Sequence, residues 1–310
     1  MNVSNTRPTI KFGGYQGPAS VHTRAAHVFG DVIESELSNA VAFSLQENIV
    51  ADGHQAADLL PMVDRGDLSL CYFSTSYLAA RVPEIALLDL PFVINDRASA
   101  YPLLDGPLGQ MLAEKIQENT NYKLLGFWDN GFRHFSNKSH AIHTPADCKN
   151  VRIRTLFSEM HAKVFSLMGF DPIALDVKDL LAGVQDGTVG AQENPLTNTY
   201  NFDIHKHHRY ITLSGHFFGV AALLCHRPSF EQWSEDIQNA VIKAAMAATQ
   251  KQRALATAED DEILAKFNAD ENEIISLSDE ERALFLDAVS PLIEEQRQKF
   301  GPEALALLGL

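Results

Sequence analysis

The first 75 residues alternate between short apolar runs and segments whose apolar residues recur at helical spacing. Leu68-Ser69-Leu70-Cys71-Tyr72-Phe73, for example, is the pattern of a buried strand that leads into a polar loop. An alternation of strands and helices is typical of a parallel α/β layer. Strands are predicted at residues 9–15, 41–45 and 68–73, and helices at 25–37 and 55–64.

The middle of the chain repeats this alternation, which predicts a second α/β lobe. The chain is expected to cross into that lobe near Asp129-Asn130-Gly131 and to return along the apolar run 217–225. A chain of 310 residues suits two lobes of roughly 150 residues better than one core. Further strands are predicted at 87–94, 122–128, 151–156 and up to Gln192, with helices at about 98–118, 158–168 and 177–185.

The segment 229–267 has neither glycine nor proline and predicts one long helix. Ser229 and Gln232 have the spacing of a capping box at its start. At 1.5 Å per residue the helix would be about 57 Å long, which exceeds one lobe. The alternative is a break near 257–261, where acidic residues crowd together. A second capping box, at Ser278 and Glu281, opens a C-terminal helix that extends to about residue 298.

Three polar side chains stand at the ends of predicted strands, namely Arg133, Arg154 and Asn194. An arginine flanked by apolar strand residues has its guanidinium held by packing, which suits two-point binding of a carboxylate. Ligands of α/β sheets bind at such strand ends, so these groups indicate a site for a small organic anion. The segments are GFWDNGFR at 126–133, VRIR at 151–154 and QENP at 192–195.

Five short motifs in a fixed order extend this pattern. They are Gly131-Phe132-Arg133, Arg152-Ile153-Arg154-Thr155, Met168-Gly169-Phe170-Asp171-Pro172, Gln185-Asp186-Gly187 and Gln192-Glu193-Asn194-Pro195. In combination they resemble the extracytoplasmic solute receptors of TRAP transporters (tripartite ATP-independent periplasmic carriers). The resemblance extends from about Phe12 to the last long helix. One departure is Gly190-Ala191, where the family usually has Asp-Gly, and it affects the expected packing of that strand.

The resemblance implies a two-lobed, periplasmic-binding-protein-like α/β fold with a hinge and a long C-terminal helix that spans both lobes. Lobe I would comprise residues 1–130 and about 220–259, and lobe II 131–219 and about 260–310. It also implies that Arg154 clamps a ligand carboxylate in the interlobe cleft, with Arg133 and Asn194 at other ligand oxygens. Closure on the ligand would then be recognised by the membrane subunits of the transporter. Two arginines fit a dicarboxylate, but a sugar acid or an aromatic acid fits as well.

Each of these three residues also has a structural explanation. Arg154 or Arg133 could form a salt bridge with an aspartate of a neighbouring loop. Asn194 could instead cap a helix that begins at Pro195. Arg152 alternates with Arg154 along the strand and is expected at the surface.

Four further residues follow strand-like runs and could line the cleft, namely Tyr15, Ser74, Trp128 and Phe218. Packing at a sheet edge is the alternative for each. Of the histidines in loops, only His216 is retained as a candidate for the cleft.

Composition narrows the possible partners and compartments. The net charge of −15 argues against nucleic acid, and no run approaches the ~20 apolar residues that cross a bilayer. Cys71 and Cys225 lie in apolar runs and are expected to be buried. The first eight residues contain no apolar segment. Because the family is exported, we expect a periplasmic protein whose signal peptide has been removed; a protein that stays inside the cell is the alternative.

Two rival functions stay open at this point. The histidines within residues 205–208 could belong to a metal-dependent hydrolase or lyase, but no His-Glu-x-x-His pattern accompanies them. A ligand-binding module that feeds a sensor would have the same cleft chemistry. No P-loop, Gly-x-Gly-x-x-Gly or Gly-x-Ser-x-Gly motif occurs. We therefore expect a receptor without catalytic residues, metal or cofactor.

Overall fold

The computed structural model describes residues 7–38 and 40–310, and the chain forms two compact units. Unit 1 comprises Met1–Phe73, Ala113–Trp128 and Ala221–Ala256, and unit 2 comprises Ser74–Leu112, Asp129–Val220 and Thr257–Leu310. The segment Ser74–Leu112 thus groups with unit 2, whereas the sequence placed it in lobe I; the lobe boundaries stay a prediction. Residues 1–6, which bear on the signal peptide, lie outside the described part.

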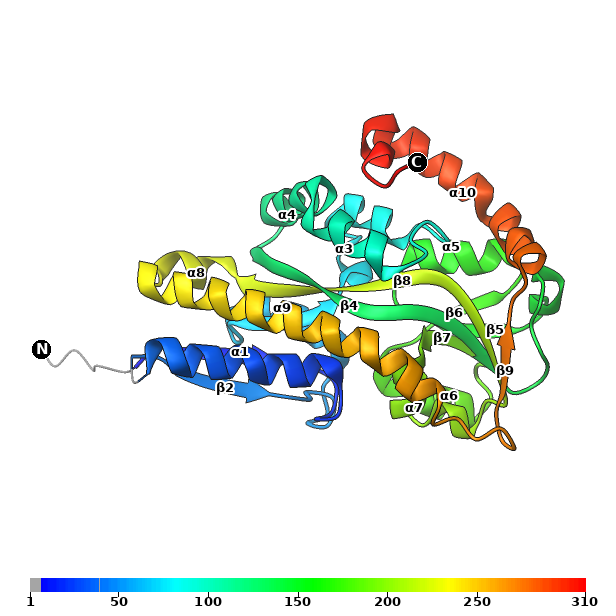
Figure 1. Ribbon diagram of the computed structural model, residues 1–310, viewed down its shortest axis with the longest axis horizontal. Helices are drawn as coiled ribbons and strands as arrows, with labels where there is room; N and C mark the ends of the chain where they lie inside the picture. Colours follow the sequence, from blue (N-terminus) through cyan, green and yellow to red (C-terminus); the bar gives the residue numbers. More distant parts are fainter. Residues whose placement is uncertain (1–6, 39) are drawn as a thin grey trace, which may run out of the picture. The chain divides into compact units, whose positions relative to one another are not determined.

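Unit 1 is built on parallel strands. The strand β1 (Thr9–Gly13) lies between β2 (Ala42–Gln46) and β3 (Leu70–Ser74). The sequence predicted these three parallel strands but not their order in the sheet. The helix α1 (Val21–Leu37) begins at Ser20, whose hydroxyl accepts from the His22 amide, and it packs beside β2 (Figure 1). A single 3₁₀ turn (Ala56–Asp58) precedes α2 (Leu59–Asp64).

Unit 2 contains the sheet that positions the candidate site. Its strands follow the order β4-β7-β5-β6, where β7 is antiparallel to β4 and parallel to β5. The helix α5 packs against β5 and β6 (Figure 1). The elements that lie wholly or partly in unit 2 include β4 (Tyr122–Asn137), β5 (Arg152–Thr155), α5 (Glu159–Leu167), β6 (Asp171–Ala174), α6 (Val177–Gln185), β7 (Ala191–Pro195), α7 (Leu196–Asn201), β8 (Tyr210–His226), β9 (Glu273–Ser276) and α10 (Asp279–Ala306).

Two predicted elements between residues 83 and 119 are wrong. The expected strand 87–94 is a 3₁₀ helix, Pro83–Asp89, followed by turns. A short, continuous apolar run cannot be distinguished from a strand by periodicity alone. The expected helix 98–118 is split into α3 (Arg97–Asp105) and α4 (Pro107–Asn119). The break is at Gly106, because the residue before a proline is disfavoured in the α region.

The long helix is confirmed, but it begins later than predicted. It is α9 (Glu235–Leu264), which continues through 257–261 without the break that the alternative required. The short α8 (Arg227–Gln232) begins at His226 with Pro228 in its first turn, so the predicted cap at Ser229 is wrong. Trp233, with ψ 150°, separates the two helices. The capping box of Ser278 and Glu281 at the start of α10 is confirmed.

None of the helices in the described part of the chain is both long enough and apolar enough to cross a membrane. The three cysteines are unpaired and buried, which confirms the expectation for Cys71 and Cys225.

Candidate functional site

A buried ion pair joins β4 to β7. The antiparallel register sets Phe135 opposite Glu193 and Arg133 opposite Pro195, so the Arg133 guanidinium reaches the Glu193 carboxylate. Arg133 Nε donates to Oε2, and Nη2 donates to Oε1 at 2.9 Å and to the Glu193 carbonyl at 3.0 Å. Both side chains are almost inaccessible to solvent, at 4% and 0%. Most of the hydrogen bonds that Arg133 is seen to donate therefore go to Glu193.

Two histidines border Glu193 on its other sides. His161 Nδ1 lies 3.9 Å from Oε1 and His216 Nε2 lies 3.5 Å from Oε2. Burial alone would raise the pKa of Glu193, but Arg133 and these two rings hold it well below its usual value. Burial lowers the pKa of His216 to about 4, so this ring is neutral near pH 7.

His161 connects Glu193 to a second buried acid. Its Nε2 lies 3.2 Å from Asp89 Oδ1, which also accepts from the Ser76 hydroxyl at 2.8 Å. Burial would lower the pKa of His161, but the two carboxylates outweigh that effect and raise it. We call Arg133, Glu193, His161, Asp89 and His216 the buried network.

Arg154 is buried without an ion pair. It lies on β5, opposite Ile173 of β6 and Gln192 of β7, and its side chain is 3% exposed. Its Nε donates to the Leu175 carbonyl at 2.9 Å, and no carboxylate of the described residues forms an ion pair with it. Burial lowers its pKa, which the more distant Tyr77, Glu193 and Asp176 only partly offset. Arg154 is thus neither turned outward nor neutralised by an aspartate, the two arrangements that would remove the basis for a clamp.

Asn194 belongs to the same region of unit 2. Its Nδ2 donates to Gln192 Oε1 at 2.5 Å, and its Oδ1 accepts from Arg133 Nη2 at 3.4 Å. The helix α7 has Pro195 as its N-terminal boundary residue and no side-chain cap, so the capping alternative for Asn194 is wrong. Despite the unusual Gly190-Ala191 sequence, Gly190 N donates to the Arg152 carbonyl at 2.9 Å and Ala191 is fully buried.

An aromatic pair lies in unit 2, and one of its rings, Tyr77, interacts electrostatically with Arg154. Tyr77 is half-buried, and its ring stands edge-on to that of Phe157, with 6.4 Å between the centroids. Phe157 follows β5 by two residues and is 50% exposed. Sites for ligands with a charged end and an apolar face combine cationic and aromatic side chains.

The other predicted site residues are divided between the two units. In unit 1, Trp128 is fully buried and its indole Nε1 donates to Thr249 Oγ1 at 3.0 Å. Tyr15 packs edge-on to Phe73, also in unit 1. In unit 2, Ser74 and Phe218 are buried, and the Phe218 ring lies 5.0 Å from that of Phe132. A ligand contact of these four residues stays a prediction.

The histidines of 205–208 point in different directions. His205 stacks on Tyr200, His207 Nε2 lies 3.2 Å from Gln185 Nε2, and His208 is buried with Nδ1 2.9 Å from Ser136 Oγ. His208 is therefore part of the interior of unit 2. Within residues 7–38 and 40–310, no group of three or more His, Cys, Asp or Glu side chains is arranged to hold a metal ion. Arg152 is exposed, as predicted, and donates to the Gly187 carbonyl.

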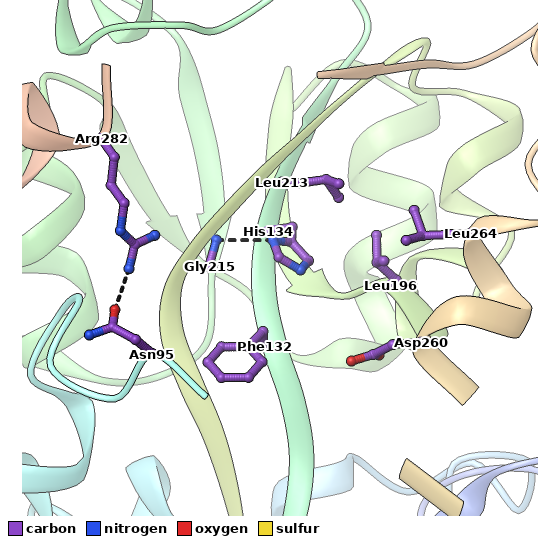
Figure 2. A pocket seen from close by; sticks show the side chains of 9 residues that line it. All are labelled: Asn95, Phe132, His134, Leu196, Leu213, Gly215, Asp260, Leu264 and Arg282. Atoms are coloured by element: carbon purple, nitrogen blue, oxygen red, sulfur yellow. Dashed lines mark hydrogen bonds between the residues drawn. The ribbon is translucent and has the colours of Figure 1, made fainter. Parts of the chain in front are cut away.

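A separate cavity of about 560 Å³ lies in unit 2 (Figure 2). Phe132 and His134 line it from β4, and because side chains alternate along a strand, Arg133 and Phe135 point away from that face. Its charged groups are engaged by the protein, since Arg282 donates to Asn95 and Asp260 binds Arg97 at 2.8 Å. None of the ligand-binding residues predicted from the sequence lines this cavity.

Comparison with known proteins decides the family. The family model for "bacterial extracellular solute-binding protein, family 7" matches residues 12–299. The chain belongs to this family. The resemblance to TRAP solute receptors is therefore confirmed, and the family consists of solute-binding proteins that serve transporters.

Relatives of family 7 agree with this assignment. The 2,3-diketo-L-gulonate-binding periplasmic protein of Escherichia coli is 26% identical over 97% of this chain and 90% of its own length. A sugar acid binding protein of Advenella mimigardefordensis, solved with galactonate, has 25% identity and a TM-score of 0.92, covering 98% and 97% of the two chains. A receptor of Sulfurospirillum deleyianum, solved with succinate, has 24% identity and a TM-score of 0.91 over 98% of each chain. The predicted fold class is confirmed.

The sequence patterns did not reveal every residue of the candidate site of this family 7 protein. Glu193 was noticed only as a neighbour of Asn194, although its partner Arg133 had been singled out. His161 and Asp89 gave no signal, because one lies on an ordinary amphipathic helix and the other on the segment mistaken for a strand. A buried charge pair between distant segments has no sequence spacing by which it could be recognised.

Proposed function

We propose that this protein is the solute receptor of a TRAP transporter and that it binds a small carboxylate-bearing molecule at Arg154. The observation that supports this proposal is the buried guanidinium of Arg154, which lacks an ion pair among the described residues. Burying a cation without a counter-charge is costly, so such a residue is expected where a ligand supplies the negative charge. Membership of family 7 gives the same expectation.

In this proposal the ligand carboxylate accepts two hydrogen bonds from the free edge of the Arg154 guanidinium. Arg133 and Asn194 hold further ligand oxygens, and Tyr77 and Phe157 exclude water. The ligand then favours a closed arrangement of the two lobes about their hinge, which requires a higher affinity for the closed form than for the open one. The membrane subunits of the transporter recognise that closed form.

The proposed compartment is the periplasm. The family consists of extracellular receptors, and the relative from Escherichia coli is periplasmic. Relatives bind a keto sugar acid, galactonate or succinate, so small organic acids are the substrate class to test.

Thermal-shift screening against an organic-acid library tests the proposal. A ligand at 100 times its dissociation constant adds about 2.7 kcal/mol to the free energy of unfolding. The Arg154→Ala variant should lose this gain, whereas Arg152→Ala, two residues along the same strand and exposed, should retain it. An acid that stabilises Arg154→Ala as strongly as the natural protein contradicts the clamp.

The proposal excludes catalysis by the histidines of residues 205–208. Metal analysis of protein purified without chelators checks this point. A stoichiometric metal ion that is lost from a His205→Ala, His207→Ala double variant would favour the hydrolase or lyase instead.

A further inference from the structure

The charges of the buried network restrict the ligand more narrowly than the two arginines alone suggest. Arg133 is already bound at two points by the Glu193 carboxylate, and neither side chain is in appreciable contact with solvent. The pair has no net charge. Arg133 therefore has no uncompensated positive charge for an acid group.

His161, the second cation of the network, is also compensated. Its ring lies between Asp89, at 3.2 Å, and Glu193, at 3.9 Å. Because Glu193 is already paired with Arg133, Asp89 supplies the charge opposite to that of His161, whose side chain is 1% exposed. A ligand anion would meet these acids rather than an open cation.

Arg154 differs from both, because it forms no ion pair with a carboxylate of the described residues. We propose that the ligand carries one carboxylate, bound by Arg154, on a neutral body bearing hydroxyl groups, and that the site discriminates against the matching dicarboxylate. The ligand is then a monocarboxylic sugar acid. This inference rests on the proposed function, since it assumes that the acid group binds Arg154.

A second carboxylate could bind Arg133 only by displacing Glu193. The displaced Glu193 side chain is 0% exposed, and of its other two neighbours His216 is neutral and His161 already faces Asp89. It would become a buried carboxylate without its principal counter-charge, and breaking a buried pair in this way is strongly unfavourable. The gain from the new ion pair would be cancelled by this loss.

Gln192 lies directly opposite Arg154 in the β5–β7 register, and its amide is held by Ser136, Thr199 and Asn194. It thereby fixes the Asn194 amide, since Gln192 Oε1 accepts from Asn194 Nδ2. An amide such as that of Asn194 both donates and accepts, which matches hydroxyl groups. The edge-on pair of Tyr77 and Phe157 provides an apolar surface for the C–H face of a sugar chain.

Calorimetry with matched ligands tests the inference on the natural protein. Galactonate, galactarate and galactitol share one carbon chain with one, two and no carboxylates, and erythronate, tartrate and erythritol form a shorter series. In at least one series we expect the monocarboxylate to bind, the dicarboxylate to bind at least about 100-fold more weakly and the polyol not to bind, because Arg154, unlike Arg133 and His161, has no ion-pair partner among the described residues.

A dicarboxylate that binds within tenfold of its monocarboxylate, or more tightly, overturns the inference and leaves the proposed receptor function intact. Binding of neither series also overturns it, and the organic-acid screen then decides separately whether Arg154 holds another acid. In Glu193→Gln, which removes the charge from the partner of Arg133, the preference for the monocarboxylate should shrink at least tenfold. An unchanged ratio in a folded Glu193→Gln protein counts against the role of this pair.

Discussion

Glu193 Oε1 lies 2.9 Å from Arg133 Nη2, and this contact joins two antiparallel strands whose side chains at this point are shielded from water. Removing the charge of one partner leaves the other buried and uncompensated. We expect Glu193→Gln to lower the free energy of unfolding by about 3–5 kcal/mol in urea denaturation. The double variant Glu193→Gln, Arg133→Met should recover much of this loss. A single variant as stable as the natural protein would show that the pair is not desolvated.

Arg154 should behave in the opposite way in the absence of ligand. Because burial of its charge is not balanced by an ion pair, Arg154→Met should be at least as stable as the natural protein in urea denaturation. The same variant should not bind the acid that the natural protein binds.

Arg154→Lys separates charge from geometry. An ammonium group cannot reproduce the planar, two-point contact of a guanidinium, so we expect at least about 30-fold weaker binding by calorimetry. Retention of the natural affinity in the lysine variant would mean that the cation acts as a point charge only.

Stability should fall as the pH is lowered from about 7 to about 4.5, because of four histidines that burial keeps neutral. In the folded chain their pKa values lie below the unfolded value of 6.5, so between these limits the unfolded chain binds protons that the folded chain does not. As the pH falls, each of these histidines lowers the free energy of unfolding by up to about 1.4 kcal/mol per pH unit in this range. The pKa is lowered to about 3 for His22, His134 and His208, and to about 4 for His216.

His161 acts in the other direction and offsets part of this loss. Its pKa is raised, so its contribution is present below the unfolded value and is lost as the pH rises through the folded value. Melting temperatures measured across the range check the balance. His208→Asn should flatten the profile. A melting temperature that rises toward pH 4.5 would contradict the expectation.

Gly131 marks the point where β4 requires a backbone without a side chain. Its φ is +83°, and a Cβ atom would lie 3.0 Å from Pro195 Cβ. Gly131→Ala should therefore lower the free energy of unfolding by about 1–2 kcal/mol, measured in urea. Gly190→Ala is the matched control, since the nearest atom to its Cβ would be 4.0 Å away and its φ is not positive. Equal stability of the two variants would show that the positive φ and the close contact at Gly131 do not require glycine.

Trp128 could stabilise the fold, contact the ligand or do both, and one variant separates these roles. Its buried indole donates to Thr249, so Trp128→Phe should lower the free energy of unfolding by about 1–3 kcal/mol. Calorimetry on the folded variant then shows whether this residue also contacts the ligand, as the sequence predicted. Unchanged stability would mean that the indole hydrogen bond contributes nothing.

The sequence by itself determined the order along the chain of most strands and helices and the long α9 helix, and it singled out Arg133, Arg154 and Asn194 as candidates. These features depend on local periodicity, on the absence of helix breakers and on short motifs, all of which are readable along one chain. Local patterns failed at 83–94, where a run of buried leucines fits a strand and a 3₁₀ helix equally well.

Only the tertiary structure decided how the two arginines differ. Both follow strand-like runs and look equivalent in sequence, yet Arg133 meets Glu193 across the β4–β7 register and Arg154 meets no acid of the described residues. The electrostatic state of a buried charge depends on groups far away in the chain, since at low dielectric the nearest counter-charge dominates. No spacing along the chain could have shown which guanidinium remains uncompensated.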